Sequence, residues 1–327
     1  MDEDGRVDRR ILAAVTRRGR RLLTHAELIE EGATNRQIEG RCDRGTLQRV
    51  HDEVYLVGAG ELSWEERLLA AVLAGRPTAA AHSFSAVAMW GLPNYSPGSV
   101  HVEVAHGTEL VARGVTVHRT RRAVPTAVVA GIRVVCLEEA LVQVAARVST
   151  RSVHRLLTTA WRMNKTTPRK VLRHLEAHGG RGVRGVCRLR EVAELYDGTR
   201  RGPGSEAEAD FLFDFLAALD AARIERPELQ HVIPVRGGTE KVVPDFAWPC
   251  RRKVIEMKGL SAHGDYLIQD EDNERESAIR AAGWELDIVT PRSMRERPAA
   301  TIARLLRFLG GPNDPGGRSA RPERKKE

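Results

Sequence analysis

The stretch that decides the fold of the C-terminal third reads Val242-Val243-Pro244-Asp245-Phe246, followed by Val254-Ile255-Glu256-Met257-Lys258. Both runs are predicted as β-strands, and the segment from Trp248 to Arg252 between them is predicted as a hairpin turn. Side chains alternate between the two faces of a strand, so Glu256 and Lys258 must share a face. We therefore predict a hairpin with one apolar face and one face that is acidic and cationic.

The segments around this hairpin extend the pattern to a whole domain. A helix is predicted from Ser205, with Glu208 in its first turns, and a strand at 229–235 precedes the hairpin. A helix at 270–282, a strand at 285–289 and a closing helix at 299–309 follow it. The order is α-β-β-β-α-β, which is typical of restriction-endonuclease-like domains.

These residues resemble the motif of the PD-(D/E)XK nuclease superfamily, through Pro244-Asp245, Glu256-Met257-Lys258 and the upstream Glu208. Residues 205–309 look more narrowly like the small endonucleases related to very-short-patch-repair enzymes. This second likeness is carried by Ser205-Glu206-Ala207-Glu208, Gln230, Pro244-Asp245-Phe246, Ile255-Glu256, His263, Asp272 to Arg275 and Gly283-Trp284. The chain departs from many such relatives at Lys258-Gly259, where they carry Asp-Gly, and in its heavier acidic run Asp270-Glu271-Asp272.

The chemistry of phosphodiester hydrolysis explains why such residues would be needed. A water must be activated and charge on the phosphate must be stabilised, and Mg²⁺ does both while binding one or two carboxylates. Asp245 and Glu256 are predicted to bind the metal, and Glu208 to complete its shell or to position Lys258. Lys258 is predicted to orient the water or to neutralise the phosphate. The alternative is an exposed hairpin that carries these residues by chance.

The resemblance implies further features of this site. Mg²⁺ is the expected metal, with Mn²⁺ as a substitute, and DNA is the expected substrate. Many such nucleases cut two strands as dimers, so a homodimer is left open. The secondary site residues implied by the likeness are Gln230, His263, Asp272 and Arg275.

Residues 8–60 are predicted to form a winged helix, because three helices are followed by two short strands. Thr24 with Glu27 has the pattern of a capping box, and Thr34 can cap the third helix. Arginine and glutamine side chains donate to base edges and phosphates. The residues predicted to contact DNA are Arg36, Gln37, Arg41, Arg44 and Arg49. Many winged helices bind protein instead, and residues 1–60 hold 11 basic and 11 acidic residues.

This head resembles the N-terminal winged helix of type IV abortive-infection antitoxins. Leu47-Gln48-Arg49-Val50 and Val54-Tyr55 carry the likeness, while Glu53 replaces the usual glycine of the wing. The resemblance covers residues 8–60 and continues weakly to residue 150. It implies a second function, a DNA-binding transcriptional regulator of a toxin–antitoxin system whose nuclease fold is catalytically silent, and it raises a toxin partner as an open question.

The middle region is predicted as a small α+β domain. Its expected helices are 64–74, 83–90, 138–148, 151–163 and 168–177, and its expected strands are 100–104, 115–119 and 132–136. The region around His82 and Ser83 is interpreted as a capped, packed helix. The remaining histidines lack metal-ligand spacing and are expected on the surface; they are His101, His106, His118, His154, His174 and His178.

The distribution of charge along the chain indicates that one region holds the substrate and another carries the catalytic residues. The chain has 327 residues and a net charge of +8, and residues 113–173 hold 13 basic residues against two acidic ones. Residues 201–312 hold 16 basic and 19 acidic residues. A basic band suits nucleic acid, so DNA is predicted to be held outside the hairpin. An arginine-rich solvated surface is the alternative.

The sequence thus predicts an α+β multidomain protein. Its expected parts are a winged-helix head at 1–60, a middle region at 61–200, a restriction-endonuclease-like domain at 201–310 and a disordered tail at 311–327. No run of about 18 apolar residues is present and the N-terminus is acidic, so a cytoplasmic protein without a membrane partner is expected. The four cysteines are far apart and expected to be reduced. The third function left open for this chain is that of a protein-binding module.

Overall fold

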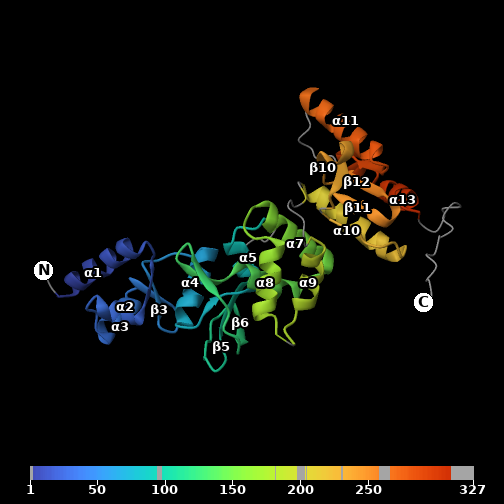
Figure 1. Cartoon of the computed structure of the whole chain (residues 1–327). Helices are drawn as coiled ribbons and strands as arrows, with labels where there is room; N and C mark the ends of the chain where they lie inside the picture. The colour runs from blue at the N-terminus through green and yellow to red at the C-terminus, as the bar shows by residue number, and fades with distance from the viewer. Residues whose placement is uncertain are drawn as a thin grey trace. The chain divides into compact units, whose positions relative to one another are not determined.

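The computed structural model describes residues 3–93, 98–180, 182–196, 203, 205–229, 231–257 and 266–310, with only the backbone described for 266–272. It shows the predicted α+β multidomain fold (Figure 1). The chain divides into two compact units. The first consists of Met1–Val153 and Lys165–Glu191, and the second consists of His154–Asn164 and Val192–Glu327. The predicted boundaries at residues 60, 200 and 310 are finer than this division and stay predictions. None of the described helices is both long and apolar enough to cross a membrane.

The first unit begins with a winged helix that has the three predicted helices and two predicted strands, and a further strand, β1, that the sequence did not predict. Its elements are α1 (Glu3–Arg18), β1 (Leu22–Thr24), α2 (His25–Glu30), α3 (Asn35–Asp43), β2 (Leu47–His51) and β3 (Val54–Val57). The three strands form an antiparallel sheet in the order β1-β3-β2. Capping boxes start α2 at Thr24 and α3 at Thr34, because each threonine accepts from the backbone three residues on. Ile11, Leu28, Ile38 and Tyr55 close the core.

The rest of the first unit is built around a five-stranded sheet in the order β6-β5-β4-β8-β7. Its strands are β4 (Ala80–Ala81), β5 (Val100–Ala105), β6 (Val115–Thr120), β7 (Thr126–Val129) and β8 (Ile132–Val135). The helices of this unit are α4 (Trp64–Ala74), α5 (Ser83–Met89), α6 (Leu137–Ala145), α8 (Pro168–His178) and most of α9 (Val186–Glu194), whereas most of α7 (Thr150–Arg162) belongs to the second unit. The predicted helices and three predicted strands are confirmed, while α9, β4 and β7 were not predicted.

The second unit contains the hairpin from which the sequence argument began. Its elements are α10 (Glu206–Ala221), β9 (Ile233–Val235), β10 (Glu240–Val242), β11 (Phe246–Trp248), β12 (Lys253–Met257), α11 (Tyr266–Ala281), β13 (Glu285–Val289), α12 (Pro291–Glu296) and α13 (Pro298–Phe308). The prediction of a single strand at 242–246 is wrong. Val242 ends β10, which pairs with β9, and a new strand starts at Phe246. Pro244 cannot donate a ladder hydrogen bond, which favours a break here.

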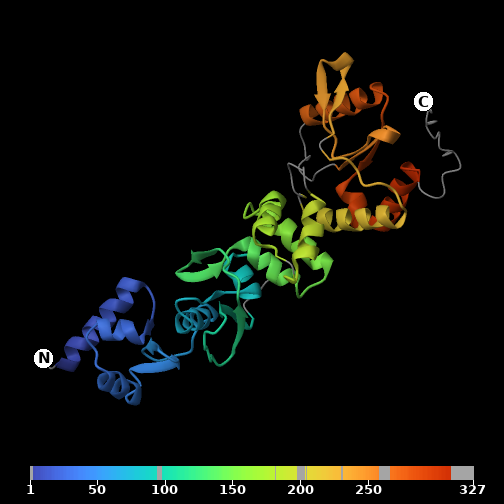
Figure 2. The same ribbon diagram turned by 60° about the horizontal axis from the view of Figure 1, so that its bottom comes forward.

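The small sheet β11-β12-β13 is covered on both faces. Phe246, Trp248 and Ile255 pack into the core formed with α10, α12 and α13. Ala247 and Val254 pack on the other face against Ile279 of α11 and Ile233 of β9. In Figure 2 the yellow α10 and the orange α11 accordingly lie on opposite sides of this sheet. The predicted charged face is therefore largely apolar and covered, and polar side chains remain at its edge.

Candidate functional site

Asp245 and Glu256 meet at one end of the β11–β12 ladder. The antiparallel ladder ends with Phe246 opposite Ile255, and Asp245 and Glu256 are the next residues beyond this pair. The charge of Asp245 acts on the Glu256 carboxyl, so the two side chains lie near each other. The carboxylate Oδ2 of Asp245 accepts a hydrogen bond of 2.8 Å from the backbone N–H of Met257. This bond fixes Asp245 beside the end of β12, and the metal-binding role of the two carboxylates stays a prediction.

The environment of Glu256 disfavours its charged form. Burial raises the pKa of Glu256, the charge of Arg275 opposes this rise, and the charge of Asp245 adds to it. The side chain of Glu256 is 15% exposed. Two carboxylates close together on a partly dry surface favour the approach of a cation, because a positive charge removes their mutual repulsion.

Arg275 of α11 brings a positive charge to these carboxylates. Its Nε donates to Oε1 of Glu256 at 3.1 Å and its Nη2 lies 2.9 Å from the same oxygen. Nη2 also donates to the carbonyl of Val243 at 2.7 Å. Arg275, named from resemblance alone as a secondary residue, therefore makes direct contact with one of the two predicted metal ligands.

Glu208 lies in the first turn of α10, which begins at the cap residue Ser205. Burial raises the pKa of the Tyr196 hydroxyl, and the charge of Glu208 adds to this rise. Because its charge acts on the Tyr196 hydroxyl, Glu208 lies near Tyr196. Its predicted part in a metal shell with Asp245 and Glu256 stays a prediction.

Several predicted site residues lie beyond what the structure describes. Lys258, Gln230 and His263 fall outside the described residues, and the side chain of Asp272 is not described. Within the described ranges, no group of three or more His, Cys, Asp or Glu side chains is arranged to hold a metal ion. Asp245 and Glu256 fit Mg²⁺ as a pair, because this ion takes one or two carboxylates and keeps water in its other positions.

The predicted DNA-contacting residues of the head separate into two groups. Arg36, Arg44 and Arg49 are exposed. Gln37 completes the capping box with Thr34, and its Nε2 donates to Asp4 at 2.9 Å. Arg41 is 1% exposed. It donates to Asp8 at 2.7 Å and to the carbonyls of Gln37 and Asp4. The prediction that Arg41 contacts DNA is therefore wrong, because its guanidinium is buried and satisfied within the head.

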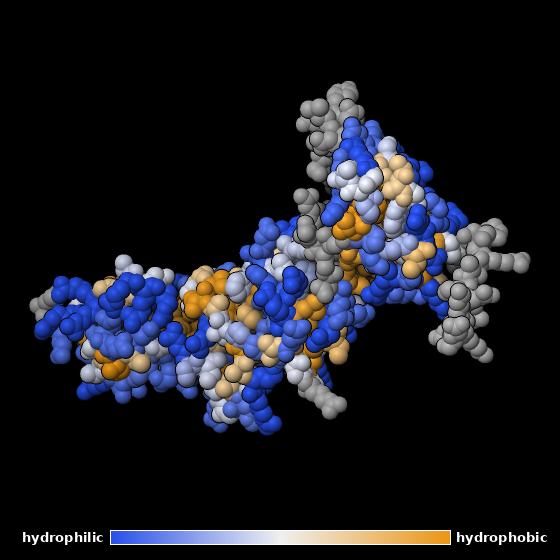
Figure 3. All heavy atoms as spheres, viewed as in Figure 1, coloured by the Kyte–Doolittle hydropathy of each residue, from blue (hydrophilic) through white to orange (hydrophobic). Residues whose placement is uncertain are grey.

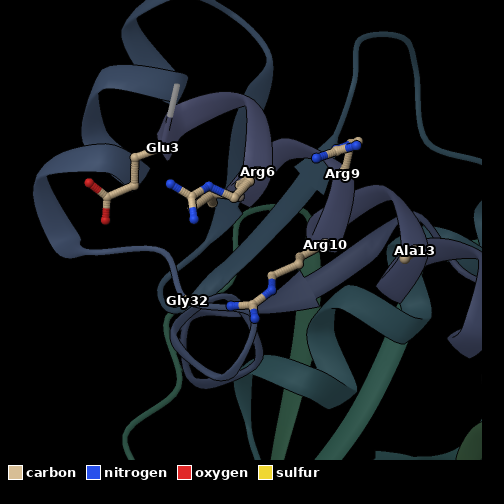
Figure 4. A pocket seen from close by; sticks show the side chains of 7 residues that line it. Glu3, Arg6, Arg9, Arg10, Ala13 and Gly32 are labelled. Atoms are coloured by element: carbon tan, nitrogen blue, oxygen red, sulfur yellow. The ribbon is translucent and has the colours of Figure 1, made fainter. Parts of the chain in front are cut away.

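A basic face on α1 was not predicted from the sequence. A cavity of ≈ 510 Å³ is lined by Glu3, Arg6, Val7, Arg9, Arg10, Ala13 and Gly32. Figure 4 shows Arg6 and Arg10 in this hollow, with the Arg10 side chain reaching toward Gly32. The signal in the sequence was the spacing of three and four residues between these arginines, which places them on one side of a helix. Hydrophilic residues cover most of the helices of the head on the face in Figure 3.

The middle region holds a buried polar cluster that the expectation of surface histidines missed. The His82 ring stacks on His118 at 4.0 Å between centroids, and His101 Nδ1 lies 3.1 Å from His118 Nε2. His82 is 8% exposed and Glu103 6%. His154 is fully buried as well. No spacing rule could reveal this cluster, because His82, His101 and His118 come from three elements that pair only in the folded sheet.

Comparison with known proteins adds little to this description. No protein-family model matches the chain, and no curated protein sequence matches it. Among solved structures, the crystal structure of the RV2827C protein from Mycobacterium tuberculosis is similar at 14% sequence identity and a TM-score of 0.39. The match covers 64% of this chain and 76% of that chain.

Proposed function

We propose that this protein is a Mg²⁺-dependent endonuclease that hydrolyses phosphodiester bonds in DNA. The observation that carries the proposal is that Asp245 and Glu256 lie near each other at the end of an antiparallel ladder, where Arg275 reaches the Glu256 carboxylate. These residues suit a phosphate site, because two carboxylates attract a divalent cation and an arginine binds phosphate oxygens. The bound metal would supply an activated water and a Lewis acid.

Each residue has a definite part in this proposal. Asp245 is held beside the end of β12 by the backbone N–H of Met257, and it would be one of the two carboxylates that bind the metal. Burial raises the pKa of Glu256. A bound cation would lower this pKa again, because it favours the charged carboxylate. Lys258 and Glu208 keep the parts that the sequence indicates, orienting the water and completing the ligand set.

The head supports DNA as the substrate. Arg36, Arg44 and Arg49 are exposed near the wing, and Arg6, Arg9 and Arg10 line the hollow on α1. Arginines on an exposed surface neutralise phosphates and release counterions, so they hold a duplex without reading its sequence. We propose that the head holds the DNA and that the second unit cuts it.

A cleavage screen tests the proposal directly. The full chain is incubated with supercoiled, mismatched and single-stranded DNA in Mg²⁺ or Mn²⁺. Cleavage of at least one substrate is expected, and Asp245→Asn, Glu256→Gln and Lys258→Ala should each abolish it. Glu285→Gln is the matched control, because Glu285 is an exposed carboxylate of the same sheet whose partner is Lys253. Absence of metal-dependent cleavage on every substrate contradicts the proposal.

A second candidate is a DNA-binding regulator of the antitoxin type with a silent nuclease fold. The contact of Arg275 with Glu256 favours it, because a guanidinium on a metal ligand opposes metal binding. This candidate predicts retention of duplex DNA by the head without cleavage in any metal. Loss of DNA retention on combined substitution of Arg36, Arg44 and Arg49 with glutamine would be expected, and undiminished retention would exclude that role for these arginines.

A further inference from the structure

Cys136, His174 and Glu139 of the first unit form a continuous line of contacts. The sulfur of Cys136 lies 3.9 Å from Nδ1 of His174. The other ring nitrogen, Nε2, lies 3.0 Å from Oε2 of Glu139. In this arrangement the thiol contacts an imidazole, and the imidazole contacts a carboxylate that orients it. Such an arrangement activates a thiol as a nucleophile.

The local fold explains why these three side chains meet. Cys136 follows strand β8 and caps helix α6 at its N-terminus without a side-chain hydrogen bond to the helix. Glu139 is three residues further on, so it lies above Cys136 on one side of the helix. His174 comes from helix α8, which packs against α6. The geometry therefore depends on two helices and is held in place by tertiary packing.

Glu139 is fixed from several sides and so orients the imidazole. Its side chain is 3% exposed, and Arg122 Nη2 donates to Oε2 at 3.1 Å. Gln143 Nε2 lies 3.4 Å from Oε1. The side chain of His174 is 8% exposed. A carboxylate held this firmly determines which nitrogen of the imidazole keeps its proton, leaving Nδ1 to face the sulfur.

The surroundings of His174 favour its charged form. Burial alone would lower the pKa of His174, but its hydrogen bonds to Cys136 and Glu139 raise this pKa to about 9. The partial positive charge at the start of a helix also stabilises a thiolate at its cap position. Cys136 is partly exposed as a residue.

We propose that Cys136 is a reactive thiolate, positioned by His174 and Glu139, and that hydroperoxides oxidise it to a sulfenic acid. The sulfur attacks the terminal oxygen of the peroxide, an S–O bond forms and the O–O bond breaks. The sulfur is oxidised by two electrons and the peroxide is reduced. The leaving alkoxide or hydroxide takes the proton of the His174 imidazolium and departs as an alcohol or as water.

The pH profile of alkylation distinguishes this thiolate from an ordinary buried thiol. Iodoacetamide labelling of the full chain is followed at each cysteine by mass spectrometry from pH 6 to 8. Cys187 and Cys250 are exposed and serve as internal references whose rates should rise about tenfold per pH unit. Cys136 should react at a nearly constant rate, roughly tenfold faster than the references at pH 6. A Cys136 profile parallel to the references would overturn the proposal.

A pair of histidine variants tests the positioning role. His174→Asn should return the Cys136 profile to that of the reference cysteines. His178→Asn is the matched control, because its ring lies 4.8 Å from that of His174 and does not touch the sulfur. After hydrogen peroxide treatment, dimedone should label Cys136 in the wild type and in His178→Asn but not in His174→Asn. Unchanged reactivity in a folded His174→Asn variant would contradict the proposal. If that variant fails to fold, the wild-type pH profile decides.

Discussion

Arg275 holds Glu256 through two guanidinium nitrogens, Nε at 3.1 Å and Nη2 at 2.9 Å from the same carboxylate oxygen. A divalent cation bound to the Glu256 carboxylate would carry the same sign of charge as Arg275, so the two would repel each other and compete for this carboxylate, unless Arg275 turns to a phosphate when substrate arrives.

Removal of Arg275 is expected to strengthen metal binding. Because this pair is partly exposed, its contribution is about 1 kcal/mol at most, which corresponds to a roughly fivefold tighter Kd. Arg275→Gln should show this gain in Mn²⁺ titrations. Arg280→Gln is the control, because Arg280 lies on the same helix and pairs with Glu276. Weaker Mn²⁺ binding by Arg275→Gln would show that Arg275 supports the metal and does not compete with it.

Glu103 is expected to make the first unit less stable as pH rises. Burial, reinforced by the charge of Glu139, raises the pKa of Glu103 from 4.5 to about 7. The folded state therefore binds more protons than the unfolded state between these values, and its stability falls by roughly 3 kcal/mol through this range. Glu103→Gln should remove this loss, so the variant gains relative to the wild type between pH 4.5 and 8. Urea unfolding measures the difference. Glu109→Gln, at an exposed carboxyl of the same unit, should show no such gain.

His118 is expected to act in the opposite direction. Burial and the charges of Arg147 and His101 lower the pKa of His118 from 6.5 to about 4. The folded state binds fewer protons than the unfolded state in this range, so stability is full above pH 6.5 and falls toward pH 4; because the ring is only half-buried, solvent screening limits the loss to about 1 kcal/mol. His118→Gln should flatten this part of the unfolding profile, whereas His106→Asn, an exposed histidine, should not. An unchanged slope in His118→Gln would show that the His82–His118 stack accepts a proton without cost.

The sequence located strands more reliably than contacts. The pattern around Glu256 predicted β12 and β13, because alternation and length are local properties. The break at Pro244 was missed, since two short hydrophobic runs on either side of a proline read as one strand. The Arg275–Glu256 contact depends on how α11 packs on the sheet, and 19 residues separate the two positions along the chain.

The sequence also could not predict which polar side chains are exposed and which are buried. Arg36 and Arg41 lie on the same predicted helix and have the same chemistry. Only the packing of α1, which brings Asp8 against Arg41, decides that one is exposed and the other buried. The histidine cluster was missed for a similar reason, because His82, His101 and His118 become neighbours only when β4, β5 and β6 pair.

Substitution of Arg41 and Arg36 should therefore have different effects. Arg41→Gln removes a buried side chain bound to Asp8 and to two carbonyls, so a loss of about 2 kcal/mol in the free energy of unfolding is expected. Arg36→Gln changes an exposed side chain and should leave stability within about 0.5 kcal/mol. It should instead weaken duplex binding and reduce the salt slope by about 0.9 if it contacts one phosphate. Urea unfolding and DNA binding at several salt concentrations measure both effects. Equal stability losses would show that Arg36 is also bound within the head, and an unchanged salt slope would remove it from the DNA surface.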